Sequence, residues 1–342
     1  MKNYFKRVAV AMLLLAMANV CAARQWYVNN YMGIKADFSS IDAAMSSANV
    51  VDGDTIYLGA GSVLGSQTIS KKVTVIGTGW GYSDSPATVA KIDGDVTIKA
   101  NGAVVVGLYV SGKCYLQANN ITVQRCRFVS SIEVNSNASI NSVRILSCYT
   151  GRISAFGSNR PGYGWEIRNN VVDGNPAQGA FAYLHSATIE NNIIRNTSSY
   201  SSNNSQHGGL LYDCHYCVVK NNILLCTSHN NQGSSMYGCT NNTYENNVMS
   251  MSSGFGDTNI MLGSTELSNI FKCTGSKESG EYYSLKEDSP AIGAGEGGID
   301  CGVMAGAYSF VPYGRPDNIP VIKKFVAPDS TTGNEINVTI GF

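Results

Sequence analysis

A short pattern of apolar and polar positions recurs along the chain. In "TIENNII" (188–194), two asparagines stand between apolar residues, and the same arrangement returns three times. The other copies are "EIRNNVV" (166–172), "VVKNNIL" (218–224) and "TYENNVM" (243–249). One copy would indicate a turn, whereas four copies indicate a repeated structural unit.

The spacing of these copies predicts a solenoid. Cys126, Cys148, Asn170, Asn192, Asn222, Asn247 and Asn269 occupy the same place in successive repeats, in steps of 22, 22, 22, 30, 25 and 22 residues. The chain lacks the leucine framework of leucine-rich repeats and the apolar spacing of helical repeats. Short strands separated by turns remain, so we expect an all-β parallel β-helix with one repeat per coil.

The residues around each asparagine pair predict how a coil is built. Apolar positions on both sides would stack inside the coil. The intervening residues Arg168, Glu190, Lys220 and Glu245 would face outward, alternating in sign, at a coil spacing of about 4.8 Å. The asparagines would form a corner, because asparagine tolerates the left-handed backbone conformation and its amides can hydrogen-bond along the stack.

The beginning of this region resembles a known family. In "DFSSIDAAMSSANVVDGDTIYLGAG" (37–61), Ser39 and Asp42 have capping-box spacing before a short amphipathic helix, which would cover the open end of the coil. Together with the asparagine corners, this stretch resembles the pectin-lyase-like family of right-handed parallel β-helices, over most of residues 26–310. The resemblance implies the fold and its hand. It implies no single activity, because the family includes lyases, hydrolases and adhesins.

The end of the chain predicts a different element. Residues 288–310, "DSPAIGAGEGGIDCGVMAGAYSF", resemble the closing segment of secreted β-helix proteins, which implies a short glycine-rich strand pair. Residues 311–342 are punctuated by proline and end in an alternating strand, "EINVTIGF". We therefore expect the β-helix over residues 24–310 and a small β appendage over 311–342.

The first residues indicate export. Three basic residues, an apolar run over 8–18 and the small residues of "VCAA" (20–23) are typical of a signal peptide over residues 1–23. The run is too short to span a membrane comfortably, so we expect no integral span. The protein would be periplasmic, cell-surface or extracellular, and lipidation at Cys21 is the alternative form of anchoring.

Composition narrows the classes of function. Charged residues make up 14% of the chain and the net charge is zero, which excludes a basic surface for nucleic acid. "CHYC" (214–217) has the spacing of a metal site but no second cysteine pair, so buried thiols or one local disulfide are expected. We expect no metal and no cofactor. Calcium stays open, although no cluster of acidic residues suggests it.

The known chemistries of the family are not evident in the outward column. Glu190 and Glu245 would lie two coils apart, but Lys220 between them would lower the pKa of both, whereas a general acid needs a raised one. No Asp-Asp pair of the polygalacturonase type occurs, and "QHGG" (206–209) is only a partial match to its histidine motif.

The insertions in the repeat hold the candidate site, because solenoid loops often gather on a binding face. We predict catalytic roles for His215, His207 and Asp213, and substrate binding by Arg160, Tyr163, Trp165 and His229. These side chains suit a polysaccharide, with lyase or glycoside hydrolase chemistry left open. The alternatives are solvated loops without a ligand and a non-catalytic surface or adhesive scaffold. Convergence of these groups in the fold would discriminate between them.

Overall fold

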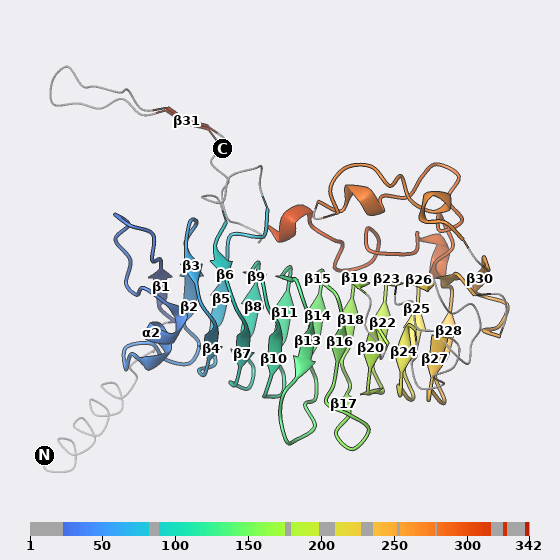
Figure 1. Ribbon diagram of the computed structural model, residues 1–342, viewed down its shortest axis with the longest axis horizontal. Coiled ribbons are helices and arrows are strands. Elements are labelled where there is room, and N and C mark those ends of the chain that lie inside the picture. The colour runs from blue at the N-terminus through green and yellow to red at the C-terminus, as the bar shows by residue number, and fades with distance from the viewer. Residues whose placement is uncertain are drawn as a thin grey trace, which may run out of the picture.

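Three long parallel sheets wind along one axis in the computed structural model (Figure 1). The structure describes residues 23–81, 89–174, 179–197, 209–226, 235–251, 254–263, 265–277 and 279–315, and two strands further on. Every pairing within the three sheets joins a strand to its counterpart in the next coil. This arrangement confirms the predicted parallel β-helix.

Each coil passes through sheets A, B and C in turn. Sheet A contains β1 (Gln25–Val28), β2 (Thr55–Leu58), β5 (Thr74–Ile76), β8 (Val104–Val106), β11 (Thr122–Gln124), β14 (Arg144–Leu146), β18 (Glu166–Arg168), β22 (Thr188–Glu190), β25 (Val218–Lys220) and β28 (Thr243–Glu245). Sheet B contains β3 (Val63–Leu64), β6 (Lys91–Ile92), β9 (Tyr109–Val110), β12 (Arg127–Phe128), β15 (Tyr149–Thr150), β19 (Val171–Gly174), β23 (Ile193–Asn196), β26 (Ile223–Cys226), β29 (Val248–Met249) and β30 (Ile260–Met261).

Sheet C contains β4 (Gln67–Ile69), β7 (Val96–Ile98), β10 (Cys114–Leu116), β13 (Ile132–Val134), β16 (Ile153–Ser154), β20 (Phe181–Ala182), β24 (Leu211–Tyr212) and β27 (Met236–Tyr237). A fourth, shorter row lies between sheets C and A in the later coils. It consists of β17 (Gly162–Tyr163), β21 (Leu184–His185) and the bridged residues His215 and Thr240.

The predicted inner and outer columns are in register. Val123, Ile145, Ile167, Ile189, Val219 and Tyr244 pair in sequence along sheet A. On the outer face, Arg168 contacts Glu190, and Lys220 lies 3.6 Å from the same carboxylate. The ladder of alternating charge is thus present over these three coils. Its alignment stabilises the stack by a modest amount, because such pairs are partly exposed.

The second asparagine of each pair is buried and forms an internal ladder. The side-chain oxygen of Asn192 accepts from the backbone nitrogen and the amide of Asn170, at 2.9 and 3.0 Å. Asn222 receives the same pair of bonds from Asn192, and Asn247 receives them from Asn222. The corner prediction is confirmed in this respect, because each buried amide is satisfied by the next coil.

Two details of that prediction are corrected. The left-handed backbone belongs to the first asparagine of each pair, as at Asn191 with φ of 55°. The ladder ends at Asn259, which accepts from Asn247 at 3.0 and 2.9 Å, rather than at Asn269. The last step is therefore shorter than the predicted 22 residues, and Asn269 lies instead in the 3₁₀ helix η2 (Leu267–Asn269).

The helix α2 (Ile41–Ser46) covers the first coil, with Ile41, Ala44 and Met45 buried. Its N-cap is Ser40, whose hydroxyl accepts from the backbone nitrogen of Ala43 at 3.0 Å. Ser39 was the expected cap, and this detail was wrong by one residue. The burial of Ile41 as the first helical residue fixes the start.

Residues 265–315, the C-terminal segment, lie along the outside of sheet B (Figure 1). The segment carries η2, η3 (Glu281–Tyr283), η4 (Glu296–Gly298) and η5 (Pro312–Gly314). Residues 288–310 contain no strand, so the strand pair implied by the resemblance is absent there. Beyond the segment, β31 (Lys324–Val326) pairs antiparallel with β32 (Thr339–Gly341), where the sequence predicted a terminal strand.

The first asparagines bind this segment. The amide of Asn169 donates to the carbonyls of Val303 and Ala305, and the carbonyl of Asn221 accepts from the nitrogen of Gly302 at 2.9 Å. Gly302 has φ of 94°, and a Cβ there would lie 2.9 Å from Ile223. Each asparagine pair therefore has two separate tasks: the second residue holds coil to coil, and the first holds the segment to the coil.

The other sequence expectations concern cysteines and membranes. All nine cysteines from Cys114 onward are free, and Cys214 and Cys217 of the "CHYC" stretch are buried. In the part of the chain that the structure describes, no His, Cys, Asp and Glu residues gather in threes as a metal site would require. Within the same residues, no helix combines the length and the apolar character needed to cross a membrane.

Candidate functional site

A column of polar and aromatic side chains follows the fourth row. Tyr163 pairs with His185, and bridges continue the row to His215 and Thr240. The rings of Tyr163 and His185 are 5.2 Å apart between centroids, and those of His185 and His215 are 4.7 Å apart. Both contacts are edge-to-face, the geometry that aromatic rings prefer.

His215 is held from two sides. Its Nε2 lies 2.9 Å from Oδ1 of Asp213, and its Nδ1 lies 2.7 Å from Oγ1 of Thr240. The side chains of His215 and Asp213 are only 19% and 23% exposed. The carboxylate can only accept, so Nε2 carries a proton and, in the neutral ring, Nδ1 accepts from the threonine hydroxyl. Both ring nitrogens are thus occupied by hydrogen bonds within the protein.

A second column of aromatic rings runs beside the first. Tyr212 and Tyr237 stack at 5.6 Å with an interplanar angle of 19°, and Tyr183 meets Tyr212 edge-on at 5.4 Å. All three rings are half-buried. Tyr183 and Asp213 occupy left-handed corner positions, with φ of 60° and 51°. This bend between sheet C and the fourth row places the two columns side by side.

The local environment perturbs two of these groups. Burial lowers the pKa of His185, and the nearby His215 lowers it further, while Asp213 partly opposes them. Burial also raises the pKa of Tyr183, with a contribution from Tyr212. At neutral pH the imidazole of His185 and the phenol of Tyr183 are therefore uncharged.

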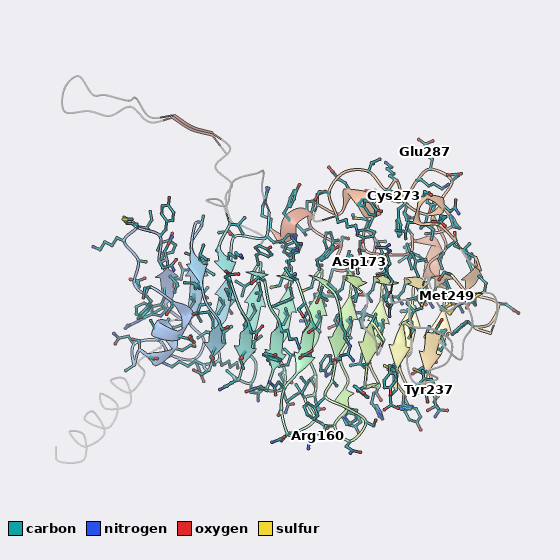
Figure 2. All side chains as sticks on the ribbon, in the orientation of Figure 1. Arg160, Asp173, Tyr237, Met249, Cys273 and Glu287 are labelled. Atoms are coloured by element: carbon teal, nitrogen blue, oxygen red, sulfur yellow. The ribbon has the colours of Figure 1, made fainter. Side chains whose placement is uncertain are left out.

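We name this region the open corner. It comprises Tyr163, Tyr183, His185, Tyr212, Asp213, His215, Tyr237 and Thr240. Figure 2 shows Tyr237 on the side of the coil away from Cys273 and Glu287 of the C-terminal segment. The open corner therefore lies away from that segment.

The structure brings together some of the predicted site residues. His215 and Asp213 are in contact, and Tyr163 reaches them through His185. Arg160 lies in the loop before β17, with its guanidinium 4.9 Å from the Phe156 ring and 3.3 Å from Asn137 Oδ1. It therefore contacts its own and the preceding coil. His207 and His229 lie outside the described residues.

Trp165 cannot take the substrate-binding role that the sequence suggested. Its side chain is 1% exposed, and Nε1 donates to the carbonyl of Ile140 at 2.7 Å. The loop ends before this residue, which immediately precedes β18 and packs in the core. The prediction was wrong because Trp165 belongs to an inward column, 22 residues after Val143 and 22 before Ala187.

Sequence reasoning missed His185, Tyr183, Tyr212, Tyr237 and Thr240. A signal for some of them was present. Tyr163, His185, His215 and Thr240 are separated by 22, 30 and 25 residues, which are the steps from Asn170 to Asn247. The period that identified the asparagine corner would have identified this row as well.

The chain matches no protein-family model, no curated protein and no solved structure. The argument for function therefore depends on the geometry of the open corner and on the chemistry of its side chains.

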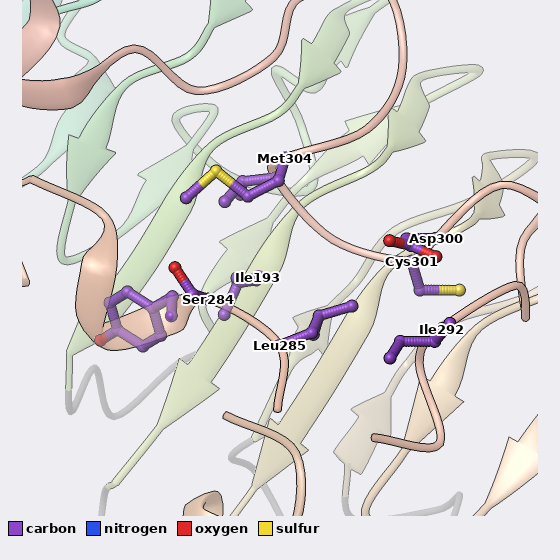
Figure 3. Close-up of a pocket in the computed structure, with 9 residues that line it drawn as sticks. Ile193, Ser284, Leu285, Ile292, Asp300, Cys301 and Met304 are labelled. Carbon is purple, nitrogen blue, oxygen red and sulfur yellow. The ribbon is translucent and has the colours of Figure 1, made fainter. Parts of the chain in front are cut away.

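One pocket lies elsewhere, between β23 and the C-terminal segment (Figure 3). It has a volume of about 270 Å³ and is lined by Ile193, Leu285, Ile292 and Met304, with Ser284 and Asp300. This volume is at the lower end of the range for small-molecule sites, roughly 300–1,000 Å³. Its apolar walls do not suit an extended polar polymer.

Proposed function

We propose that the open corner binds a polysaccharide, with the chain laid along the coil axis. The observation that carries this proposal is the stack of Tyr212 on Tyr237, continued by Tyr183. Rings on successive coils repeat at the coil spacing of about 4.8 Å. A polymer of flat, ring-shaped units can place successive units against such a series of rings.

The polar groups beside these rings complete the argument. Asp213, His215 and Thr240 supply a carboxylate, an imidazole and a hydroxyl in one fixed network. Aromatic faces that contact the C–H groups of a sugar, next to polar groups that bond its hydroxyls, are the combination a carbohydrate site needs. The resemblance to the pectin-lyase-like family and the export signal expected over residues 1–23 favour a carbohydrate ligand as well.

The geometry supports binding more than cleavage. Both nitrogens of His215 are already bonded, so it has no free nitrogen to exchange a proton with a substrate. Glu190 is engaged by Arg168 and Lys220, which stabilise its charged form. The proposed function therefore ends at recognition.

A glycan array followed by calorimetry on the best ligand tests the proposal. Tyr237→Ala should weaken binding about tenfold, or roughly 1.4 kcal/mol, because one stacking ring is lost. Tyr57→Ala is a matched control, since Tyr57 is a half-buried tyrosine on the outer face of sheet A. It should leave affinity unchanged.

Two outcomes would contradict the proposal. If no glycan binds, the non-catalytic scaffold becomes the better description. If Tyr57→Ala weakens binding as much as Tyr237→Ala, the ligand lies elsewhere on the coil. Release of shortened chains or of unsaturated ends from the bound glycan would show that the protein also cleaves it.

A further inference from the structure

The loop between β1 and α2 exposes a group of apolar side chains at the N-terminal end of the coil (Figure 1). Met32 is 92% exposed, Tyr31 is 55% exposed and Ile34 is 47% exposed. Isolated exposed apolar residues are common on protein surfaces, but three within four residues form a patch. We name residues 31–34 the apolar turn.

Hydrogen bonds fix the turn in this exposed position. The nitrogen of Ile34 donates to the carbonyl of Tyr31 at 3.2 Å, and Gly33 adopts φ of 85°, as the third residue of a type II turn does. The amide of Asn30 binds both the nitrogen and the carbonyl of Val63, at 3.0 and 2.6 Å. The loop is thus tied to β3, and its apolar tip does not fold back onto the coil.

The size and charge of the patch indicate what it contacts. A stable protein interface buries roughly 800 Å² on each partner, far more than one four-residue turn provides. The interface of a lipid bilayer needs only a few inserted apolar side chains, and tyrosine favours the level of the headgroups. Lys35 follows the turn directly, and residues 29–36 contain no acidic residue to repel lipid phosphates.

The position of the turn in the chain points the same way. The apolar run over residues 8–18 and Cys21 come shortly before β1, which begins at Gln25. Four residues span at most about 13 Å, so a lipid attached at Cys21 would hold the bilayer near this end of the coil. Stable attachment to a bilayer usually takes two weak signals, and the turn would supply the second.

We infer that the apolar turn inserts into the interface of a lipid bilayer and sets the N-terminal end of the coil against it. This inference is independent of the proposed glycan binding, because the turn follows β1, in the first coil, and the open corner lies in the later coils.

Oxidative footprinting on the full chain provides a test specific to this site. Mild peroxide converts exposed methionines to sulfoxides, and mass spectrometry reports each methionine separately. Vesicles of phosphatidylcholine, with and without phosphatidylglycerol, should slow oxidation of Met32 roughly fivefold or more. Met304, which is 41% exposed on the C-terminal segment, is the internal control and should react at the same rate throughout.

A matched pair of variants sharpens the result. Met32→Asp should lose vesicle-dependent ordering of the turn, measured as hydrogen exchange of residues 29–36, while Met32→Leu should keep it. Equal oxidation of Met32 with and without vesicles would overturn the inference, even if the protein sediments with lipid through its first residues. Protection of Met32 by a protein partner in the absence of lipid would overturn it as well.

Discussion

The two corners of the coil follow the same stacking rule and end in opposite states. At the corner between sheets A and B, which we name the closed corner, Asn170, Asn192, Asn222 and Asn247 bond one another, and the C-terminal segment covers their neighbours. At the open corner, the same steps stack tyrosines and histidines whose rings stay half-exposed. Stacking alone therefore does not distinguish a structural column from a recognition surface.

The difference lies in which partners the side chains have. Each amide of the closed corner has its full set of hydrogen bonds from the chain itself, so no valence is left for a ligand. Rings of the open corner satisfy only one another's edges and keep a face toward solvent. In a coil of repeated units, the column that binds a ligand is expected to be the one that the chain leaves incomplete.

The largest effect should come from breaking the internal ladder. Asn192→Leu removes the acceptor for two bonds from Asn170 and the donor for the carbonyl of Ile167 at 2.9 Å. Because these groups are fully buried, leaving them unpaired should cost roughly 3–5 kcal/mol. Denaturant unfolding measures this loss.

An exposed asparagine provides the control for the ladder. Asn135→Leu changes the same side chain on the outer surface and should cost no more than about 0.5 kcal/mol. Similar midpoints for the two variants would show that the buried ladder contributes little.

The attachment of the C-terminal segment should be the next most sensitive. Asp173 accepts hydrogen bonds from Tyr283 at 2.6 Å and Lys277 at 2.9 Å, and it pairs with Arg195. Asp173→Asn should loosen the segment by about 2–3 kcal/mol, because a buried charge network loses its anion. Hydrogen exchange should then rise over residues 279–310 while the coil stays protected.

The same carboxylate predicts an effect of acid. Burial alone would raise the pKa of Asp173, but the bonds from Tyr283 and Lys277 and the charge of Arg195 outweigh it, so the pKa is lowered. Its stabilisation is therefore complete above the ordinary carboxyl pKa of about 4 and is lost as the pH falls through the lower, folded value. Asp93→Asn, at an exposed pair with Lys91, is the control that should leave the segment in place.

The smallest effect belongs to the open corner. The pKa of His185 is lowered, so its neutral form contributes stability above its ordinary pKa of about 6.5, and this contribution is lost as the pH falls through the folded value. The facing groups are His215, Asp213 and Tyr163. Melting temperatures of the wild type should fall between pH 7 and pH 5 slightly more than those of His185→Gln. Parallel curves would place this histidine among the groups that do not sense pH.

Sequence alone predicted the parts of the fold that repeat. The period located Asn192 and its ladder, since identical steps force identical places in successive coils. It could not predict the bonds from Asn169 and Asn221 to the C-terminal segment, because that segment carries no repeat. Trp165 was misplaced and His185 was missed for one shared reason: the insertions were treated as loops, although their ends had already returned to the register of the coil.

The grip of the C-terminal segment also limits how the protein can change in length. The segment contacts the coil at Trp80, Asn169, Asn191 and Asn221, spanning many consecutive turns of the solenoid. Duplicating or deleting one turn beneath it would shift every later contact by one coil spacing, about 4.8 Å, while the segment kept its own length. Gains or losses of whole turns would therefore require a compensating change in residues 265–315. The segment acts as a gauge of the number of turns, in a fold whose stacking would otherwise permit any number.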